Sequence, residues 1–110
     1  MATYYNGTEK RKHLRVDWKA PVKITRGDIQ VEGEIRNISL GGVLIACELD
    51  LKYGERVTVH FAVPKMQEPV HAVCAVRWIS AEKEHGLNFM GLKAIETWAI
   101  SQLMRQLSGS

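Results

Sequence analysis

Two arginines four residues apart near the start of the chain have the chemistry of a phosphate or guanine site. Arg11 and Arg15 are the first and last residues of the segment Arg11-Lys12-His13-Leu14-Arg15. This spacing places both guanidinium groups on one side whether the segment is helical or extended. Each guanidinium offers a planar fork of N–H donors that fits a phosphate or the O6/N7 edge of guanine. By itself the pair favours a solvated basic arm, because two arginines four residues apart occur often.

A second polar stretch, Asn37-Ile38-Ser39-Leu40-Gly41-Gly42, ends an alternating apolar segment. We expect Asn37 to continue the inward-facing positions of that segment, which are Ile29, Val31, Gly33 and Ile35. Asparagine and serine at such a place either hydrogen-bond the local backbone to shape a turn, or present an amide and a hydroxyl to the edge of a base. The glycine pair permits positive φ, or the close approach of a flat ligand to the backbone.

Other common chemistries lack their motifs in this sequence. There is no G-x-S-x-G serine, no Gly-x-Gly-x-x-Gly and no phosphate-binding Walker loop. The histidines and cysteines show no metal-ligand spacing, and they are His13, His60, His71, His85, Cys47 and Cys74. We therefore expect no catalytic residue, no metal site and no cofactor, and we expect both cysteines to be buried, reduced thiols.

Charge is concentrated at the start of the chain. Residues 1–26 hold seven Lys and Arg against two Asp and Glu, whereas the rest of the chain carries a slight excess of acids. A basic end favours an anionic partner such as a nucleic acid, a phosphorylated small molecule or a membrane surface. The alternative is a solvated, flexible arm.

The composition indicates one folded domain. The chain has 110 residues, of which 45% are hydrophobic and 25% charged, close to the average for a globular domain. The longest apolar run, Val43–Cys47, is far shorter than the roughly 20 residues that span a bilayer. The first residues lack the apolar stretch of a secretion signal, so we expect no membrane insertion and a cytoplasmic location.

Alternation of apolar and polar residues predicts strands between about residues 20 and 91. Runs of this kind occur at 29–36, 57–63 and 70–79, and a short one at 87–89 follows Glu84-His85-Gly86, which we predict to be a turn. Five or six short antiparallel strands joined by short turns favour a small barrel or sandwich. The aromatic residues within these patterns are expected in the core; they are Trp18, Trp78, Tyr53 and Phe61.

After Gly91 the apolar period becomes that of a helix, predicted over about 92–107. Its apolar stripe is formed by Leu92, Ile95, Ala99, Leu103 and Leu107. The stripe must be covered, either by the open end of the same barrel or by a second copy of the helix in a homodimer. Residues 1–9 show no pattern and are predicted to be a flexible arm, so the domain is assigned to residues 10–110.

Taken together, these features resemble the PilZ domain family. The resemblance rests on Arg-x-x-x-Arg at 11–15 and, about twenty residues later, Asn-x-Ser-x-x-Gly at 37–42, inside a small β-barrel that ends in a helix. It extends to Leu51–Val57, to Val76-Arg77-Trp78 and to Gly86–Phe89, so it covers nearly the whole chain from about residue 10. The fold that the resemblance implies is mainly β: a six-stranded antiparallel barrel with a C-terminal helix.

The resemblance also implies a function, because PilZ domains are bacterial receptors for cyclic di-GMP. Carried over, Arg11 and Arg15 would hold phosphates and guanine edges, Asn37 and Ser39 would contact a guanine, and Gly42 would leave room for the base. Lys10 and Gly41 are added as flanking candidates. In the family the residue before the first arginine influences whether one nucleotide or a stacked pair binds, and Lys10 as a third cation favours the pair. Such a receptor would signal through a partner protein that the sequence does not identify.

Two other functions remain open on the sequence. One is a nucleotide-independent scaffold for pilus, flagellar or polysaccharide machinery. The other is a nucleic-acid-binding barrel, which the net acidic body of the chain beyond residue 26 disfavours.

Overall fold

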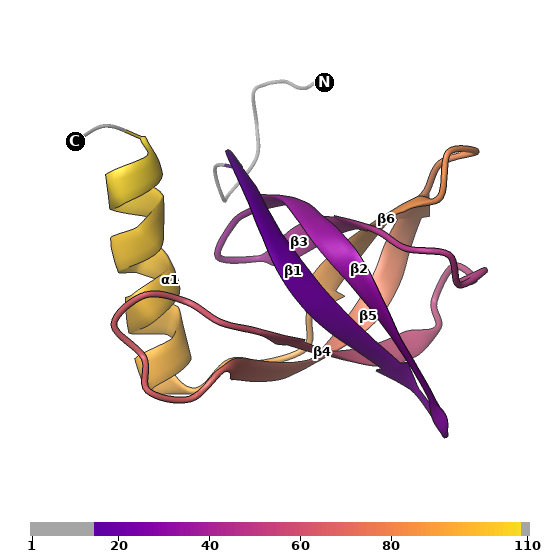
Figure 1. Ribbon diagram of the computed structural model, residues 1–110, viewed down its shortest axis with the longest axis horizontal. Coiled ribbons are helices and arrows are strands. Elements are labelled where there is room, and N and C mark those ends of the chain that lie inside the picture. Colours follow the sequence, from indigo (N-terminus) through magenta and orange to yellow (C-terminus); the bar gives the residue numbers. More distant parts are fainter. Residues whose placement is uncertain (1–14, 109–110) are drawn as a thin grey trace.

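The computed structural model describes residues 15–108, and within that range six strands are followed by one helix (Figure 1). In chain order the elements are β1 (Val16–Arg26), β2 (Ile29–Ile38), β3 (Gly42–Ala46), β4 (Arg56–Phe61), β5 (Val70–Ile79), β6 (Glu84–Phe89) and α1 (Ala94–Leu107). The predictions for Lys10 and Arg11, and for a flexible arm over residues 1–9, fall outside the described residues.

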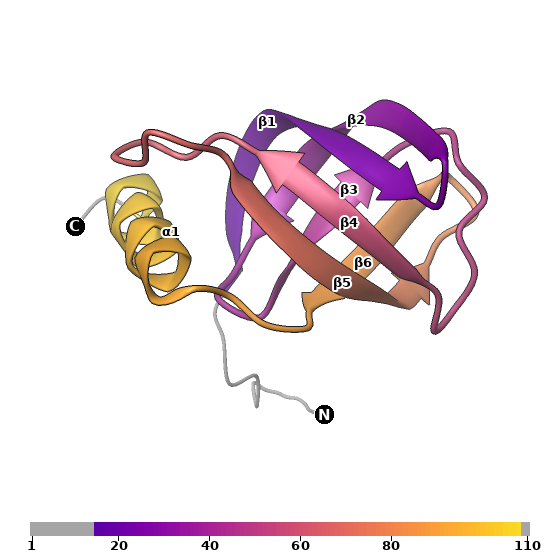
Figure 2. The ribbon, with the colours of Figure 1, turned by 90° about the horizontal axis from the view of Figure 1, so that it is seen from below.

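The strands form a closed antiparallel barrel, as the sequence predicts. Each strand pairs with the next in the order β1-β2-β3-β6-β5-β4, and β4 pairs back to β1 (Figure 2). The closing seam is short, since only Lys23–Thr25 of β1 pair with Thr58–His60 of β4. The first part of β1 therefore pairs with β2 alone, and it carries Arg15 at its start towards the end of β2.

The predicted turn at Glu84-His85-Gly86 is wrong, because these residues begin β6. The turn lies just before them, where Lys83 adopts a φ of 65°. The hydroxyl of Ser80 holds this turn by accepting hydrogen bonds from the backbone N–H groups of Glu82 and Glu84. Glycine and histidine favour a turn on composition, but here both occupy regular strand positions.

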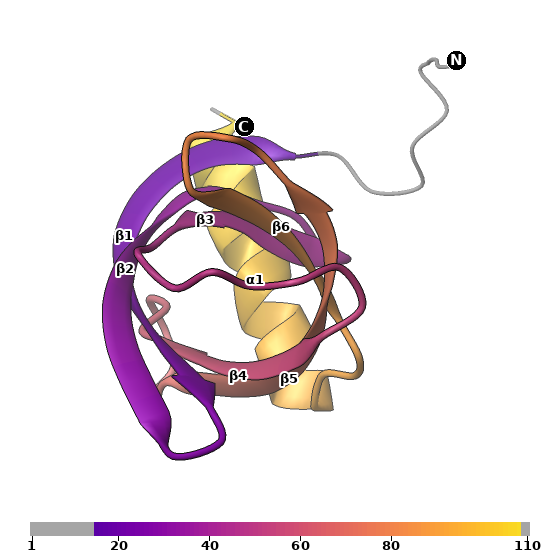
Figure 3. The same ribbon diagram turned by 90° about the vertical axis from the view of Figure 1, so that its right-hand side faces the viewer.

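Helix α1 lies across one end of the barrel (Figure 3), so the apolar stripe is covered by the chain's own core. Ala99, Ile100 and Leu103 are buried and belong to the same cluster as the barrel interior. The buried face is rotated from the predicted stripe, since Ile95 is 52% exposed and Leu107 37% exposed. The spacing of apolar residues predicts only which side of a helix is apolar on average. The contacts with the barrel determine which part of that side is buried.

A buried carboxylate fixes the start of this helix. Glu96 is only 3% exposed, and its Oε1 accepts a hydrogen bond from the backbone N–H of Lys93 at 2.8 Å. Its Oε2 accepts one from the backbone N–H of His71 on β5 at 3.1 Å. One side chain thus satisfies a free donor at the helix N-terminus and joins the helix to the barrel.

Candidate functional site

The pairing of β1 with β2 brings two of the predicted site segments together. Asp17 lies opposite Asn37 and Val16 lies opposite Ile38, so Arg15 is the next residue outward beside Ser39. Arg15 and Asp17 are both exposed, whereas Val16 between them is half-buried. In this alternation Arg15 and Asp17 share a face of the strand, and Asn37 is on that face because directly paired residues share one.

Asn37 lies on the outside of the barrel, so the prediction that it faces inward is wrong. A bulge in β2 leaves Arg36 without an opposite residue, since Ile35 pairs with Ile45 and Asn37 pairs with Leu44. One extra residue reverses the alternation. Ile38 then takes the inward position and is fully buried, whereas Asn37 is only half-buried. The bulge therefore turns the amide of Asn37 to the outer surface.

Ser39 organises the loop between β2 and β3. Its Oγ accepts hydrogen bonds from the backbone N–H groups of Gly41 at 3.0 Å and Gly42 at 3.1 Å. The same hydroxyl donates to the carbonyl of Gly42 at 3.3 Å, and the side chain is 6% exposed. These bonds occupy the donor and both lone pairs of the hydroxyl, so in this structure Ser39 shapes the loop beside Asn37.

Gly42 is needed by the packing of β3 against β6. A Cβ at this position would overlap the carbonyl oxygen of Leu87 and lie 2.9 Å from its carbonyl carbon. No ordinary side chain fits there without moving the backbone of β6. The absence of a side chain at Gly42 thus makes room for the neighbouring strand β6. The resemblance had suggested a different reason for this glycine, which is space for a base.

The outer face next to Asn37 continues into an exposed tryptophan, Trp78, which the sequence pattern had assigned to the core. Asn37 pairs with Leu44, Leu44 with Gly86, and Gly86 with Trp78, so the four residues form one row across β2, β3, β6 and β5. We call this row the outer row. Trp78 is 51% exposed, and its Cε3 comes within 3.8 Å of the place of a Cβ at Gly86, so the glycine lets the indole lie over β6.

The prediction of core positions holds for Phe61, which is buried, and fails for Trp78 and for Tyr53, which is 68% exposed. In the case of Trp78 a second bulge is responsible, because β5 shifts register between Val76 and Trp78. Strict alternation from the buried Val76 would have placed Trp78 inside. The outer row therefore depends on one bulge in β2 and one in β5. The pattern of polar and apolar residues in the sequence does not reveal such bulges.

A small ion-pair network borders the outer row. The Nε of Arg36 lies 2.9 Å from Glu34, and its Nη1 lies 3.6 Å from Glu84. Glu34 and Glu84 both pair with Ala46, so they occupy the neighbouring row of the same face. These pairs are partly exposed and stabilise the fold little, but they hold the guanidinium of Arg36 over the row next to the outer row.

Another buried polar group, His85, lies inside the barrel. It is 2% exposed, and its Nδ1 is 3.9 Å from the Sγ of Cys47. Burial lowers the pKa of His85, nearby Lys83 lowers it further, and Asp50 opposes the shift. Burial also raises the pKa of Cys47 and raises that of Cys74 to about 12, and both cysteines are free thiols, as predicted.

We expect the buried imidazole of His85 to make stability dependent on pH. Its pKa is lower in the folded than in the unfolded protein, so the unfolded state binds the proton more readily and stability falls as the pH drops below about 6.5. Urea unfolding at about pH 7 and about pH 5.5 measures this loss. His85→Asn should show a smaller loss than the wild type, and an equal loss in the two proteins would contradict the prediction.

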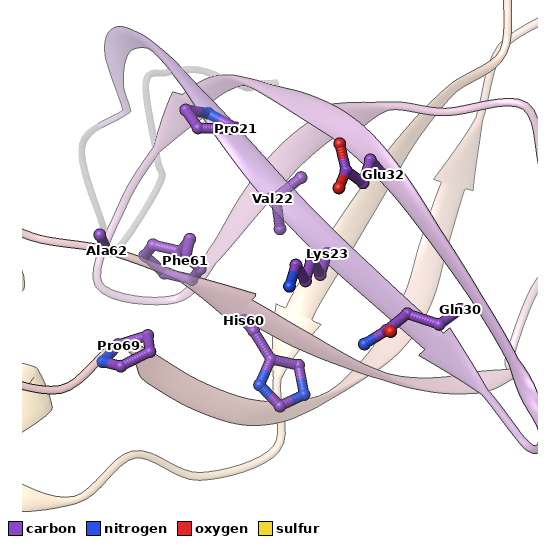
Figure 4. Close-up of a pocket in the computed structure, with 9 residues that line it drawn as sticks. All are labelled: Pro21, Val22, Lys23, Gln30, Glu32, His60, Phe61, Ala62 and Pro69. Carbon is purple, nitrogen blue, oxygen red and sulfur yellow. The ribbon is translucent and has the colours of Figure 1, made fainter.

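Those predicted site residues that the structure describes do not line the cavity that opens where β1 and β4 diverge. This cavity has a volume of about 380 Å³, and Figure 4 shows it between Pro21 and Lys23 of β1 and His60 of β4. Its walls are largely apolar, with Lys23, His60, Gln30 and Glu32 at one side. It belongs to the β1–β4 seam, whereas the outer row crosses β2, β3, β6 and β5.

Comparisons with known proteins place this geometry in context. The model of the PilZ domain matches residues 9–107, and no curated protein matches the sequence. The inhibitor of motility MotI/DgrA from Bacillus subtilis has a TM-score of 0.76 and 24% identity, and the match covers 93% of this chain and 53% of that one. The chain thus spans about half the length of MotI.

Two solved PilZ domains are similar over most of their length. The YcgR domain from Escherichia coli, in a structure with c-di-GMP, has a TM-score of 0.71 and 14% identity, covering 91% of this chain and 92% of that one. The PilZ domain of CeSA from a cellulose-synthesizing bacterium has a TM-score of 0.66 and 15% identity, covering 86% and 98%. At these identities the likeness establishes a common fold. Within residues 15–108, α1 is neither long nor apolar enough to cross a membrane.

Proposed function

Because this chain belongs to the PilZ domain family, we propose that it is a receptor for cyclic di-GMP, which binds on the outer row and is held by the arginines that precede β1. The YcgR domain that shares its fold was solved with this nucleotide, which supports the choice of ligand. The proposal treats the chain as a binding protein and assigns it no catalytic step.

One observation carries the proposal: the β1–β2 register places Arg15 beside Asn37 and Ser39. Val16 pairs with Ile38 and Asp17 with Asn37, so the end of the Arg-x-x-x-Arg segment and the start of the Asn-x-Ser segment meet on one face. Arg15 and Asn37 are thus within reach of one ligand, although about twenty residues separate them in the sequence.

The donors and acceptors of this face suit a ligand with two phosphates and two guanines. Arg15, with Arg11 and Lys10 from the preceding segment, would supply charge-assisted hydrogen bonds to phosphates and to the O6/N7 edge of guanine. The amide of Asn37 would hydrogen-bond a guanine. Ser39, Gly41 and Gly42 would keep the loop in place, since the serine hydroxyl is engaged with the loop backbone.

Trp78 would supply the apolar part of the site. Its indole is half-exposed on the outer row, and a planar aromatic surface beside an amide is suited to stacking a purine. We expect Trp78→Ala to weaken cyclic di-GMP binding by about 1 kcal/mol, or roughly fivefold. Tyr53→Ala is the matched control, because Tyr53 is more exposed still and lies in the β3–β4 connection. Equal affinity of Trp78→Ala and the wild type would remove Trp78 from the site.

Signalling follows from closure of the N-terminal arm over the ligand. Ordering a backbone costs about 1–2 kcal/mol per residue, so the hydrogen bonds of the two arginines must exceed the cost of the residues that become fixed. The surface formed by the closed arm and ligand would then change the affinity for a partner protein. Because β1 begins at Val16, directly after Arg15, the arginine-bearing segment is joined to the barrel.

Amide chemical shifts during a titration with cyclic di-GMP test where the ligand binds. We expect the largest changes at Asn37, Gly41 and Gly86 and at the indole N–H of Trp78, and little change at His60 and Lys23 in the β1–β4 seam. Changes centred on the seam cavity of Figure 4 would reject the outer row as the binding face.

A further inference from the structure

The fold brings together two histidines that are eleven residues apart in the sequence. His60 on β4 pairs directly with His71 on β5, and their ring centroids are 4.1 Å apart with the planes inclined by 42°. His60 is half-buried and His71 is exposed, so the pair is accessible from solvent. The pair belongs to β4 and β5, so it is independent of Asn37 and of the proposed nucleotide site.

The separation of the rings suits two imidazoles on one metal ion. A metal about 2.0–2.1 Å from one nitrogen of each ring lies roughly 3.2 Å from each ring centre, so two rings at adjacent coordination positions have centres roughly 4.5–5 Å apart. The observed 4.1 Å is slightly shorter than this range, so a small separation of the two rings would accommodate the ion. Because the strand register fixes both backbones, the side chains need only rotate to direct a nitrogen each at the same point.

Further donors line the pocket into which the pair opens. This pocket, about 260 Å³ in volume, is bounded by His60 and His71 together with Met66 and Glu68 of the β4–β5 loop. Glu96 also lines it, but its carboxylate already accepts backbone hydrogen bonds. Among residues 15–108 no three His, Cys, Asp or Glu side chains are grouped closely enough to hold a metal. The two histidines are therefore the only protein ligands that the described structure already holds together at this pocket.

The charges around the pair nearly balance. Lys23 pairs with His60 across the seam and Lys93 lines the pocket, while Glu68 and Glu96 line it as well. A divalent cation therefore meets no net positive cluster. Imidazole ligands suit Cu²⁺, Ni²⁺ and Zn²⁺, and Cu²⁺ binds nitrogen ligands most strongly among these ions.

We propose that His60 and His71 form a binding site for a divalent transition-metal ion, with Cu²⁺ the preferred ion, and that water or the side chains of the β4–β5 loop complete its coordination. A bound ion would join this loop to the two strands that it connects. The site is separate from the outer row and does not depend on the binding of a nucleotide.

Titration of the full chain with Cu²⁺, followed by calorimetry, tests the proposal. We expect saturable binding of one ion at the pair, and each of His60→Ala and His71→Ala should lower the affinity more than tenfold, since even the loss of a supporting residue costs roughly 10–100-fold. His13→Ala is the matched control and should leave this binding unchanged. Zn²⁺ should bind the same site more weakly.

A spectroscopic measurement keeps the test valid if a variant is poorly folded. Electron paramagnetic resonance of the wild-type Cu²⁺ complex should show coupling to two imidazole nitrogens, and the conservative variant His60→Gln should remove one of them. Absence of saturable binding, unchanged affinity in both alanine variants, or loss of binding in His13→Ala would each overturn the site.

Discussion

Arg15→Ala is expected to weaken cyclic di-GMP binding about 5- to 150-fold, because a lost arginine fork costs about 1–3 kcal/mol. Arg15 is exposed and adjoins the strand pair that ends at Asn37, so its guanidinium is placed to reach a phosphate or a guanine on the outer row. Calorimetric titration of the two proteins with cyclic di-GMP measures the difference. Arg11→Ala should have an effect of the same order.

The matched control is Arg105→Ala, which removes the same charge from the exposed last turn of α1. It should bind cyclic di-GMP as the wild type does, because α1 contributes no residue to the outer row and alanine is compatible with a helix. If Arg15→Ala and Arg105→Ala lose affinity equally, the effect is one of net charge and the arginine clamp is wrong.

Gly42→Ala is expected to destabilise the fold by more than about 3 kcal/mol, because the added methyl would overlap the backbone of β6. Relief requires β3 and β6 to separate where Gly42 pairs with Asn88, and the Ser39 loop would move with them because three of its hydrogen bonds end on Gly42. Urea unfolding measures the loss as a lower midpoint.

Gly91→Ala provides the comparison for this prediction. A Cβ at Gly91 would meet nothing within 4 Å, so this substitution should change the free energy of unfolding by less than about 0.5 kcal/mol. A Gly42→Ala protein as stable as Gly91→Ala would show that the approach of β3 to β6 can relax, and that glycine at this position serves the ligand instead.

The strands could be predicted from the sequence because most of them alternate regularly, whereas the choice of a barrel over a sandwich came from the resemblance to the PilZ domain family. A buried face requires an apolar residue at every second position, and the chain obeys this through β4 and much of β1. The helix was predicted for the same reason, since its period is unbroken from 94 to 107. The exact buried face of α1 was missed because it depends on how the helix crosses the barrel.

The outer row could not be predicted, because two bulges create it. Arg36 in β2 and Arg77 in β5 each add one residue, and each reverses the direction of the next side chain. Asn37 and Trp78 are thereby turned outward, whereas alternation had placed both inside. A bulge depends on the hydrogen bonding between strands, and these strands are far apart in the sequence.

The role of Gly42 was missed for a related reason. The sequence shows that a glycine is present but not which atoms occupy the space of its absent side chain, and here they belong to Leu87 on another strand. The histidine pair was missed likewise, because His60 and His71 have no ligand spacing along the chain and meet only through the β4–β5 register.

The central claim is that this barrel recognises cyclic di-GMP, and calorimetric titration of the wild-type chain with that nucleotide tests it most directly. The account predicts saturable binding, with one nucleotide or a stacked pair per chain, and no comparable binding of GTP or of the linear diguanylate. The account would be contradicted if cyclic di-GMP gave no heat of binding, or if all three ligands gave the same heat of binding. Either result would favour a scaffold that works without a nucleotide.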